Sequence, residues 1–141
     1  MHFINKYDPD LIFLSEPQIH SCNLDQTMKY LQGSYKVALN TADKLDPELP
    51  LFKSKATGGT AVLWKSTYDA YVSVHPVEST AFLPVIFQPP GCAVSVHIAV
   101  YLPTLGQESQ FLEELSKLSL AIEVLSDDHP DVPIYLRGIL M

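Results

Sequence analysis

Apolar positions along the chain form several short runs and one long stretch with helical spacing. The run from Leu11 to Leu14 has no polar position, so we expect a strand that is buried on both faces. The glycine pair Gly58–Gly59 precedes an apolar run that ends at Lys65 and predicts a core strand containing Trp64. Further strands are predicted at residues 35–39, 70–74, 82–87, 92–101 and 133–138.

The main helix is predicted from Thr104 to just before Asp127. Five apolar residues recur at helical spacing and predict its buried face: Phe111, Leu115, Leu118, Ile122 and Leu125. Glu113 and Lys117 are four residues apart, which favours an ion pair on the polar side. A shorter helix is predicted over residues 23–32, where Asn23 is a suitable cap.

Composition limits the class of protein. The 141 residues are 47% hydrophobic, which is enough for one domain with a core. The formal charge of −7 argues against a broad basic surface for nucleic acid, because phosphate contacts need Lys and Arg. Two cysteines and no signal peptide favour an intracellular protein, nuclear or cytoplasmic, and no apolar run is long enough to span a membrane.

Two residues at predicted strand ends are candidates for chemistry. Glu16 follows the buried run and is itself followed by Pro17, so its carboxylate suits a metal site or an acid/base role. The alternative for Glu16 is a solvated side chain in a loop. Tyr101 ends the longest predicted strand, on the same face as His97, and the alternative for it is an interface tyrosine. For His97 itself we expect a structural role.

The order of four segments resembles the endonuclease/exonuclease/phosphatase superfamily, most of all the endonuclease domains of LINE-type retrotransposons. These segments are residues 8–16, residues 58–65, Tyr101-Leu102-Pro103 and residues 133–138. The resemblance implies an α/β (α+β) fold, a partial four-layer αββα sandwich with one mixed sheet and helices on its outer face. Residues 1–141 would be a single truncated domain, the N-terminal half, without the first strand. One sheet face would then be uncovered, which predicts an apolar patch and possible self-association.

The resemblance also implies a function, the Mg²⁺-dependent hydrolysis of phosphodiester bonds in nucleic acid. In that reading Glu16 is a metal ligand and Tyr101 is a catalytic contact to the scissile phosphate. Ile139 and Met141 stand where the family has an aspartate and an asparagine, so a fragment that is inactive alone is expected. Two alternatives stay open: a non-catalytic interaction module or degenerate remnant, and a phosphatase of the same superfamily.

Overall fold

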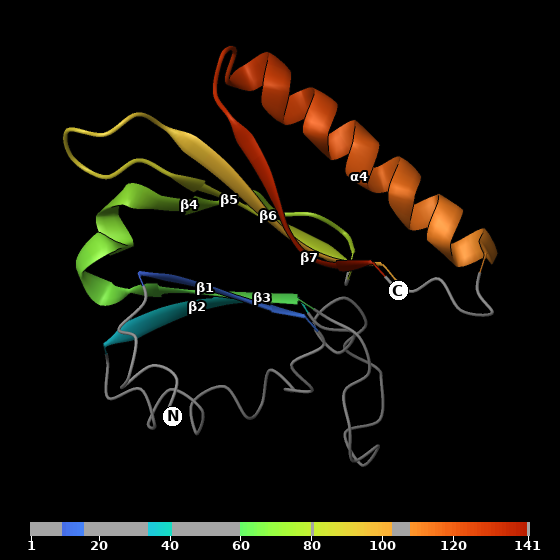
Figure 1. Cartoon of the computed structure of the whole chain (residues 1–141), viewed down its shortest axis with the longest axis horizontal. Coiled ribbons are helices and arrows are strands. Elements are labelled where there is room, and N and C mark those ends of the chain that lie inside the picture. Colours follow the sequence, from blue (N-terminus) through green and yellow to red (C-terminus); the bar gives the residue numbers. More distant parts are fainter. Residues whose placement is uncertain (1–9, 16–33, 41–59, 80, 103–107, 141) are drawn as a thin grey trace.

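The structure is a computed structural model that describes residues 10–15, 34–40, 60–79, 81–102 and 108–140 (Figure 1). The shorter helix predicted over residues 23–32 lies outside these ranges. The described elements, in chain order, are β1 (Leu11–Ser15), β2 (Tyr35–Asn40), β3 (Thr60–Lys65), the 3₁₀ helix η2 (Ser66–Tyr71), β4 (Val72–Val74), β5 (Phe82–Phe87), β6 (Ser95–Leu102), α4 (Glu108–Asp128) and β7 (Ile134–Leu140).

The strands form two sheets. In the first sheet the order is β1-β3-β2, and both outer strands run antiparallel to β3. In the second the order is β4-β5-β6-β7, antiparallel except for the parallel pair β6–β7, which α4 connects. The two sheets lie face to face, and α4 covers the far side of the second one (Figure 1). The α/β class and the partial αββα sandwich are therefore confirmed, although the strands divide into two sheets where one mixed sheet was expected.

Strand β6 is buried on both of its faces. On one face Val96, Ile98 and Val100 belong to the core cluster that includes the α4 residues. On the other face Ala99 packs with Val62 and Trp64 of β3. The expectation of an uncovered sheet face is therefore wrong at this strand, because the β1-β3-β2 sheet of the same chain covers it. The reason for expecting self-association through that face is removed as well.

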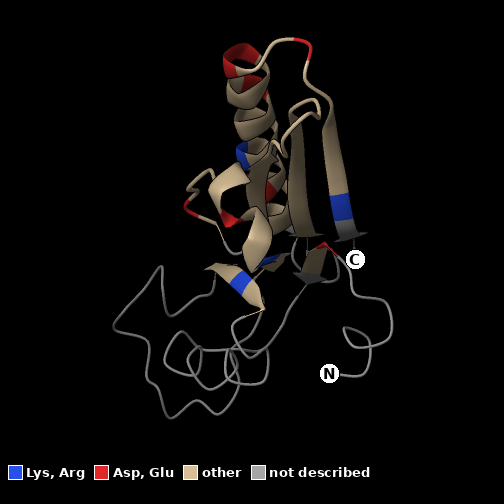
Figure 2. Cartoon of the chain, turned by 90° about the vertical axis from the view of Figure 1, so that its left-hand side faces the viewer, with Lys and Arg blue, Asp and Glu red and all other residues tan. Residues whose placement is uncertain are grey.

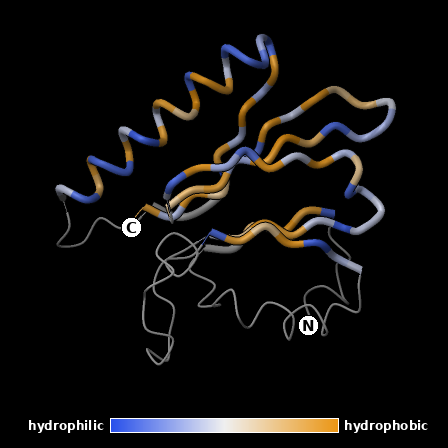
Figure 3. Tube along the Cα trace, turned by 180° about the vertical axis from the view of Figure 1, so that it is seen from behind, coloured by the Kyte–Doolittle hydropathy of each residue, from blue (hydrophilic) through white to orange (hydrophobic). Residues whose placement is uncertain are grey.

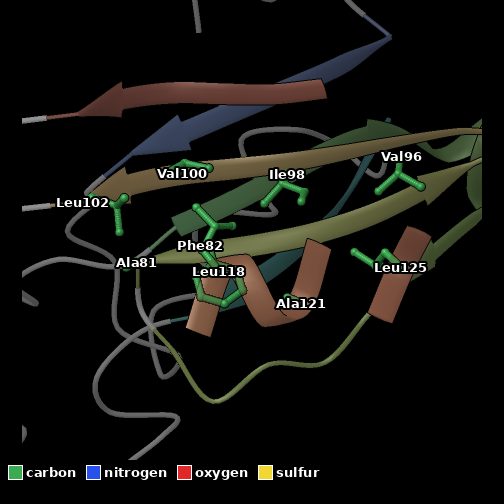
Figure 4. Close-up of a cluster of buried hydrophobic side chains, with 9 residues drawn as sticks. All are labelled: Ala81, Phe82, Val96, Ile98, Val100, Leu102, Leu118, Ala121 and Leu125. Atoms are coloured by element: carbon green, nitrogen blue, oxygen red, sulfur yellow. The ribbon is translucent and has the colours of Figure 1, made fainter. Parts of the chain in front are cut away.

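Helix α4 packs on the second sheet through a narrow apolar stripe, and hydrophobic and hydrophilic residues alternate along it (Figure 3). Leu118, Ala121 and Leu125 are buried against β5 and β6 (Figure 4). Phe111 and Ile122 pack at the margin of this cluster, as the spacing predicts. Leu115 is different, since it remains 37% exposed.

The helix also ends later than predicted. It continues through Asp127 and Asp128, and the His129 N–H donates to the Leu125 carbonyl oxygen at 2.9 Å. Asp131 then takes a left-handed conformation, with φ of 66°, which turns the chain toward β7. The predicted ion pair is present, with Lys117 Nζ 3.6 Å from Glu113 Oε1.

The predicted strand over residues 70–74 is only partly correct. Ala70 and Tyr71 belong to η2, and β4 begins at Val72. A side-chain hydrogen bond explains the turn: Trp64 Nε1 donates to Asp69 Oδ1 at 2.9 Å, which holds Asp69 close to the end of β3. Trp64 is 7% exposed, so its predicted place in the core is confirmed. Strand β6 begins at Ser95, three residues later than the predicted strand.

The burial of α4 gives a direct test of the packing. Leu125 is 0% exposed and Leu120 is 61% exposed on the same helix. We expect Leu125→Ala to lower the free energy of unfolding by about 2–5 kcal/mol, because it leaves a cavity. Leu120→Ala is the matched control and should change it by less than about 0.5 kcal/mol. Urea unfolding followed by circular dichroism measures both values, and equal losses would contradict this placement of α4.

Candidate active site

The polar ends of several strands meet at one end of the sandwich. In the first sheet, Ser15, Thr60 and Asn40 lie in one row across β1, β3 and β2. Asn40 Nδ2 donates to the backbone oxygen of Phe82, the first residue of β5, at 3.5 Å. Phe82 pairs with Val100 near the end of β6. The ends of β1 and β6 therefore lie at the same end of the molecule, as Figure 1 also shows.

Tyr101 lies at this end of the sandwich. It follows Val100 and alternates with Ala99, so its side chain is on the face of β6 that is turned toward the first sheet. The residue is half-buried, and its backbone N–H donates to the Ala81 oxygen at 2.7 Å. Strand β1 contacts both β6 and β7 across the interface. Tyr101 therefore lies at the end of the sandwich at which β1 also ends.

The other predicted site residues are only partly described. Glu16 is the next residue in the sequence after β1 and lies outside the described residues, so its role as a metal ligand stays a prediction. Met141 also lies outside them. Ile139 is in β7, paired in register with Tyr101. A hydrocarbon side chain has no oxygen with which to bind a metal ion, so this strand position adds no ligand.

Sequence reasoning missed two polar residues in the same region. Thr60 is 0% exposed, and its Oγ1 has no hydrogen-bond partner among the described residues. Asn40 lies next to it in the sheet register. Their positions in the sequence could have identified them, because both are polar residues at the ends of strands. Both are on the face of the first sheet that is turned toward the second sheet. Together with Tyr101 they give this end of the interface a polar lining.

His97 lies deeper between the sheets, on the same face as Tyr101. Its ring stacks on Tyr135 with 5.2 Å between centroids, and the Phe13 ring is 5.8 Å away on the other sheet. The Arg137 guanidinium carbon lies 5.1 Å from the centre of the Tyr135 ring. His97 Nε2 is 2.9 Å from Ser95 Oγ, whereas Nδ1 has no hydrogen-bond partner among the described residues. His97 is therefore packed between the rings of Tyr135 and Phe13, and among the described residues one of its two ring nitrogens has a hydrogen-bond partner.

This environment disfavours a charged imidazole. His97 is 8% exposed, and its burial lowers the pKa of the ring below 6.5. The positive charge of Arg137 lowers the pKa further. The ring is consequently held in its neutral form in the folded protein near neutral pH.

The described residues do not form a metal centre. Nowhere among them do three His, Cys, Asp or Glu side chains come together as possible ligands. The acidic run at residues 127–131 is no exception, and two of its residues simply extend α4. Magnesium needs near-octahedral oxygen coordination, and the predicted donor set of this chain is the single carboxylate of Glu16. In this part of the chain there is also no helix with the length and hydrophobicity of a membrane crossing.

The fold is similar to several solved structures. The human Nocturnin catalytic domain, solved with a bound sulfate anion, superposes with a TM-score of 0.65 at 11% identity, over 97% of this chain and 53% of that one. ANGEL2, described as a 2',3'-cyclic phosphatase, superposes with a TM-score of 0.62 at 15% identity, over 97% of this chain and 40% of ANGEL2. The endonuclease domain of TRAS1, a telomere-specific non-LTR retrotransposon, superposes with a TM-score of 0.50 at 10% identity, over 97% of this chain and 49% of the TRAS1 domain.

The chain thus spans about half the length, or less, of the structures it matches. TDP2 from Caenorhabditis elegans is also matched over only part of its length. It superposes with a TM-score of 0.61 at 14% identity, over 97% of this chain and 39% of TDP2. These neighbours all have folds of the endonuclease/exonuclease/phosphatase type. No protein-family model and no curated protein sequence matches the chain.

The neutral, buried His97 predicts a pH-dependent stability. Above pH 6.5 the ring is neutral in both the folded and the unfolded chain, so its burial has no protonation cost. As the pH falls through 6.5, the unfolded chain binds a proton that the folded protein excludes, and the free energy of unfolding decreases. The extra slope is at most about 1.36 kcal/mol per pH unit, and it disappears below the folded pKa.

Urea unfolding between about pH 7.5 and pH 5.5 measures this slope. His97→Gln, which cannot titrate, should lose less stability over the range than the unsubstituted chain. Arg137→Gln should reduce the slope only in part, because it removes the second cause of the lowered pKa and leaves the burial. If all three proteins lost the same free energy, protonation at His97 would not be involved.

Proposed function

We propose that this chain, which is similar over 97% of its length to about half of the Nocturnin catalytic domain, supplies one part of a phosphodiesterase site and is inactive alone. The observation that carries the proposal is the meeting of the ends of β1 and β6. It brings the strand that precedes Glu16 and the strand that contains Tyr101 to the same end of the sandwich. The substrate class is nucleic acid, by likeness to the fold neighbours, which include a retrotransposon endonuclease.

In this proposal Tyr101 is the phosphate contact. A phenolic O–H can donate a hydrogen bond to a non-bridging phosphate oxygen, and hydrogen bonds to charged groups are stronger than those between neutral groups. The half-buried position of Tyr101 keeps the ring fixed while its strand end stays at the edge of the sandwich. Asn40 and Thr60 line the same region with polar atoms.

Glu16 is proposed as the ligand of a magnesium ion. Bound Mg²⁺ would neutralise charge on the phosphate oxygens. A single carboxylate holds this ion weakly, because the remaining positions need oxygen ligands that Ile139 and Met141 do not have. Inactivity in isolation follows from this incomplete donor set, as does the need for ligands from outside the 141 residues.

The first test measures binding, since no turnover is expected. A fluorescein-labelled DNA oligonucleotide is titrated with the chain, with and without Mg²⁺, and its anisotropy is recorded. We expect weak binding that Mg²⁺ strengthens and that Glu16→Gln makes insensitive to Mg²⁺. Tyr101→Phe should weaken it by roughly 3-fold to 10-fold, the loss of one hydrogen bond.

The matched controls are Glu113→Gln and Tyr71→Phe. Glu113 is an exposed carboxylate on α4, and Tyr71 is an exposed tyrosine on η2. Both controls should leave the Mg²⁺-dependent part of the binding unchanged. If Mg²⁺ had no effect on the unsubstituted chain, the proposal would be wrong and a non-catalytic interaction module would be favoured.

Nicking of supercoiled plasmid tests the inactivity separately. We expect no nicking by the purified chain in Mg²⁺ above that of Glu16→Gln. Nicking that Glu16→Gln abolishes would show an active enzyme and would refute the inactive fragment and the remnant alike.

A phosphatase is the second candidate, because ANGEL2 is described as a 2',3'-cyclic phosphatase and has a similar fold. The two functions differ in the preferred phosphoester. A 2',3'-cyclic nucleotide that displaced the labelled oligonucleotide at much lower concentration than the corresponding 5'-nucleotide would favour the phosphatase. Equal displacement would favour the nucleic-acid phosphodiesterase.

A further inference from the structure

A pocket of about 310 Å³ lies between α4 and the segment of residues 75–79. Its lining is mostly apolar and comes from both elements and from β5: Val77, Phe82, Leu120, Ala121 and Val124, together with His75, Glu78, Ser79 and Lys117. Ligand sites are typically concave and mostly apolar, with a few polar groups, and this pocket has the size of the smallest of them.

A set of polar contacts holds the two walls of the pocket in place. Ser79 Oγ accepts a hydrogen bond from the Ala81 N–H at 3.0 Å and donates one to Oε2 of Glu114 on α4. The other oxygen of the same carboxylate, Oε1, is 3.4 Å from Lys117 Nζ. Glu114 therefore links the helix to the 75–79 segment, which keeps the distance between the walls fixed.

The rim of the pocket exposes apolar side chains that take no part in the core. Leu120 is 61% exposed and Val124 is 40% exposed, one helical turn apart. Both lie outside the stripe of Leu118, Ala121 and Leu125 that packs on the sheet. Exposed apolar groups beside a pre-formed pocket are a common feature of protein interaction sites.

Helix α4, which forms one wall of the pocket, has a strongly negative formal charge. In the sequence of α4 six residues are acidic and one is basic: Glu108, Glu113, Glu114, Glu123, Asp127 and Asp128 against Lys117. The Lys117 ammonium group is shared between Glu113 and Glu114, so it does not offset the rest. Figure 2 shows the acidic positions along α4, and Glu78 adds an exposed carboxylate on the opposite wall.

We propose that this pocket binds a basic segment of another protein. An apolar side chain of that segment would enter the pocket, and its Lys or Arg residues would face Glu78 and the acidic residues of α4. Charge complementarity selects this occupant. Nucleic acid is excluded because its phosphates would face carboxylates, and a second copy of this chain is disfavoured because each copy carries a formal charge of −7. The pocket lies on the α4 side of the second sheet, whereas Tyr101 is on the face turned toward the first sheet, so the proposal does not depend on the phosphodiesterase reading.

The test uses a synthetic amphipathic peptide of leucine and lysine as the probe, labelled with fluorescein and titrated with the whole chain. The key comparison is between Leu120→Lys and Leu136→Lys. Both replace an exposed leucine, 61% and 57% exposed, and both change the net charge by the same amount, but Leu136 is on β7. We expect Leu120→Lys to weaken binding by at least about tenfold, the scale of losing one buried leucine contact together with its charge match. Leu136→Lys should weaken it by less than about threefold, through its exposed charge alone.

Two further measurements keep the proposal open to refutation. A matched peptide with glutamate in place of lysine should bind at least about tenfold more weakly than the lysine peptide, because it faces like charges. Equal losses for Leu120→Lys and Leu136→Lys would mean that net charge alone attracts the probe and would overturn the proposal. A dimer in sedimentation that Leu120→Lys dissociates would identify a second copy as the occupant and would overturn it too.

Discussion

The described structure depends on the burial of β6 on both faces. Its even-numbered residues belong to the core cluster that includes α4, whereas His97 and Ala99 pack against residues of the β1-β3-β2 sheet. Because side chains alternate along a strand, one eight-residue element joins the helix layer to the first sheet. The same alternation places His97 and Tyr101 together on the inner face. The position of the candidate site is thus a consequence of how the core is packed.

The sequence predicted the elements better than their partners. Strands with clear apolar patterns, such as 82–87, and the helical spacing of Leu118 and Leu125 were found because these signals are local. The two-sheet arrangement was missed, because the pairing of β1 with β3 joins segments that are distant in the sequence. The short η2 was missed because it depends on the hydrogen bond between Trp64 and Asp69, which no periodic pattern reveals. Leu115 has the correct spacing for the buried face and is still 37% exposed, so spacing alone does not fix burial.

In the candidate site, too, individual residues were predicted better than their contacts. Tyr101 was identified from the resemblance of Tyr101-Leu102-Pro103 to a family motif, and it lies at the same end of the sandwich as the end of β1. The Thr60 hydroxyl, which has no hydrogen-bond partner among the described residues, and the contact from Asn40 to Phe82 became visible only with the register of the sheets. The stack of His97 on Tyr135 likewise needs the parallel ladder between β6 and β7. Glu16 and Met141 lie outside the described residues, so the statements about these two positions rest on the sequence alone.

The parallel pairing of β6 with β7 has a consequence for how the chain folds. Strands β4, β5 and β6 follow one another as antiparallel neighbours, so they can assemble through local contacts. Strand β7 is separated from β6 in the sequence by the whole of α4, so their pairing closes a long loop. Strand β3 pairs with β1 and β2, and both partners are distant from it in the sequence. Closing such long loops costs entropy before any contact compensates for it, and proteins with this topology fold slowly. During that interval the apolar residues between the two sheets, among them Val62, Leu83 and Val85, are exposed to water, which is the state in which β-rich chains aggregate.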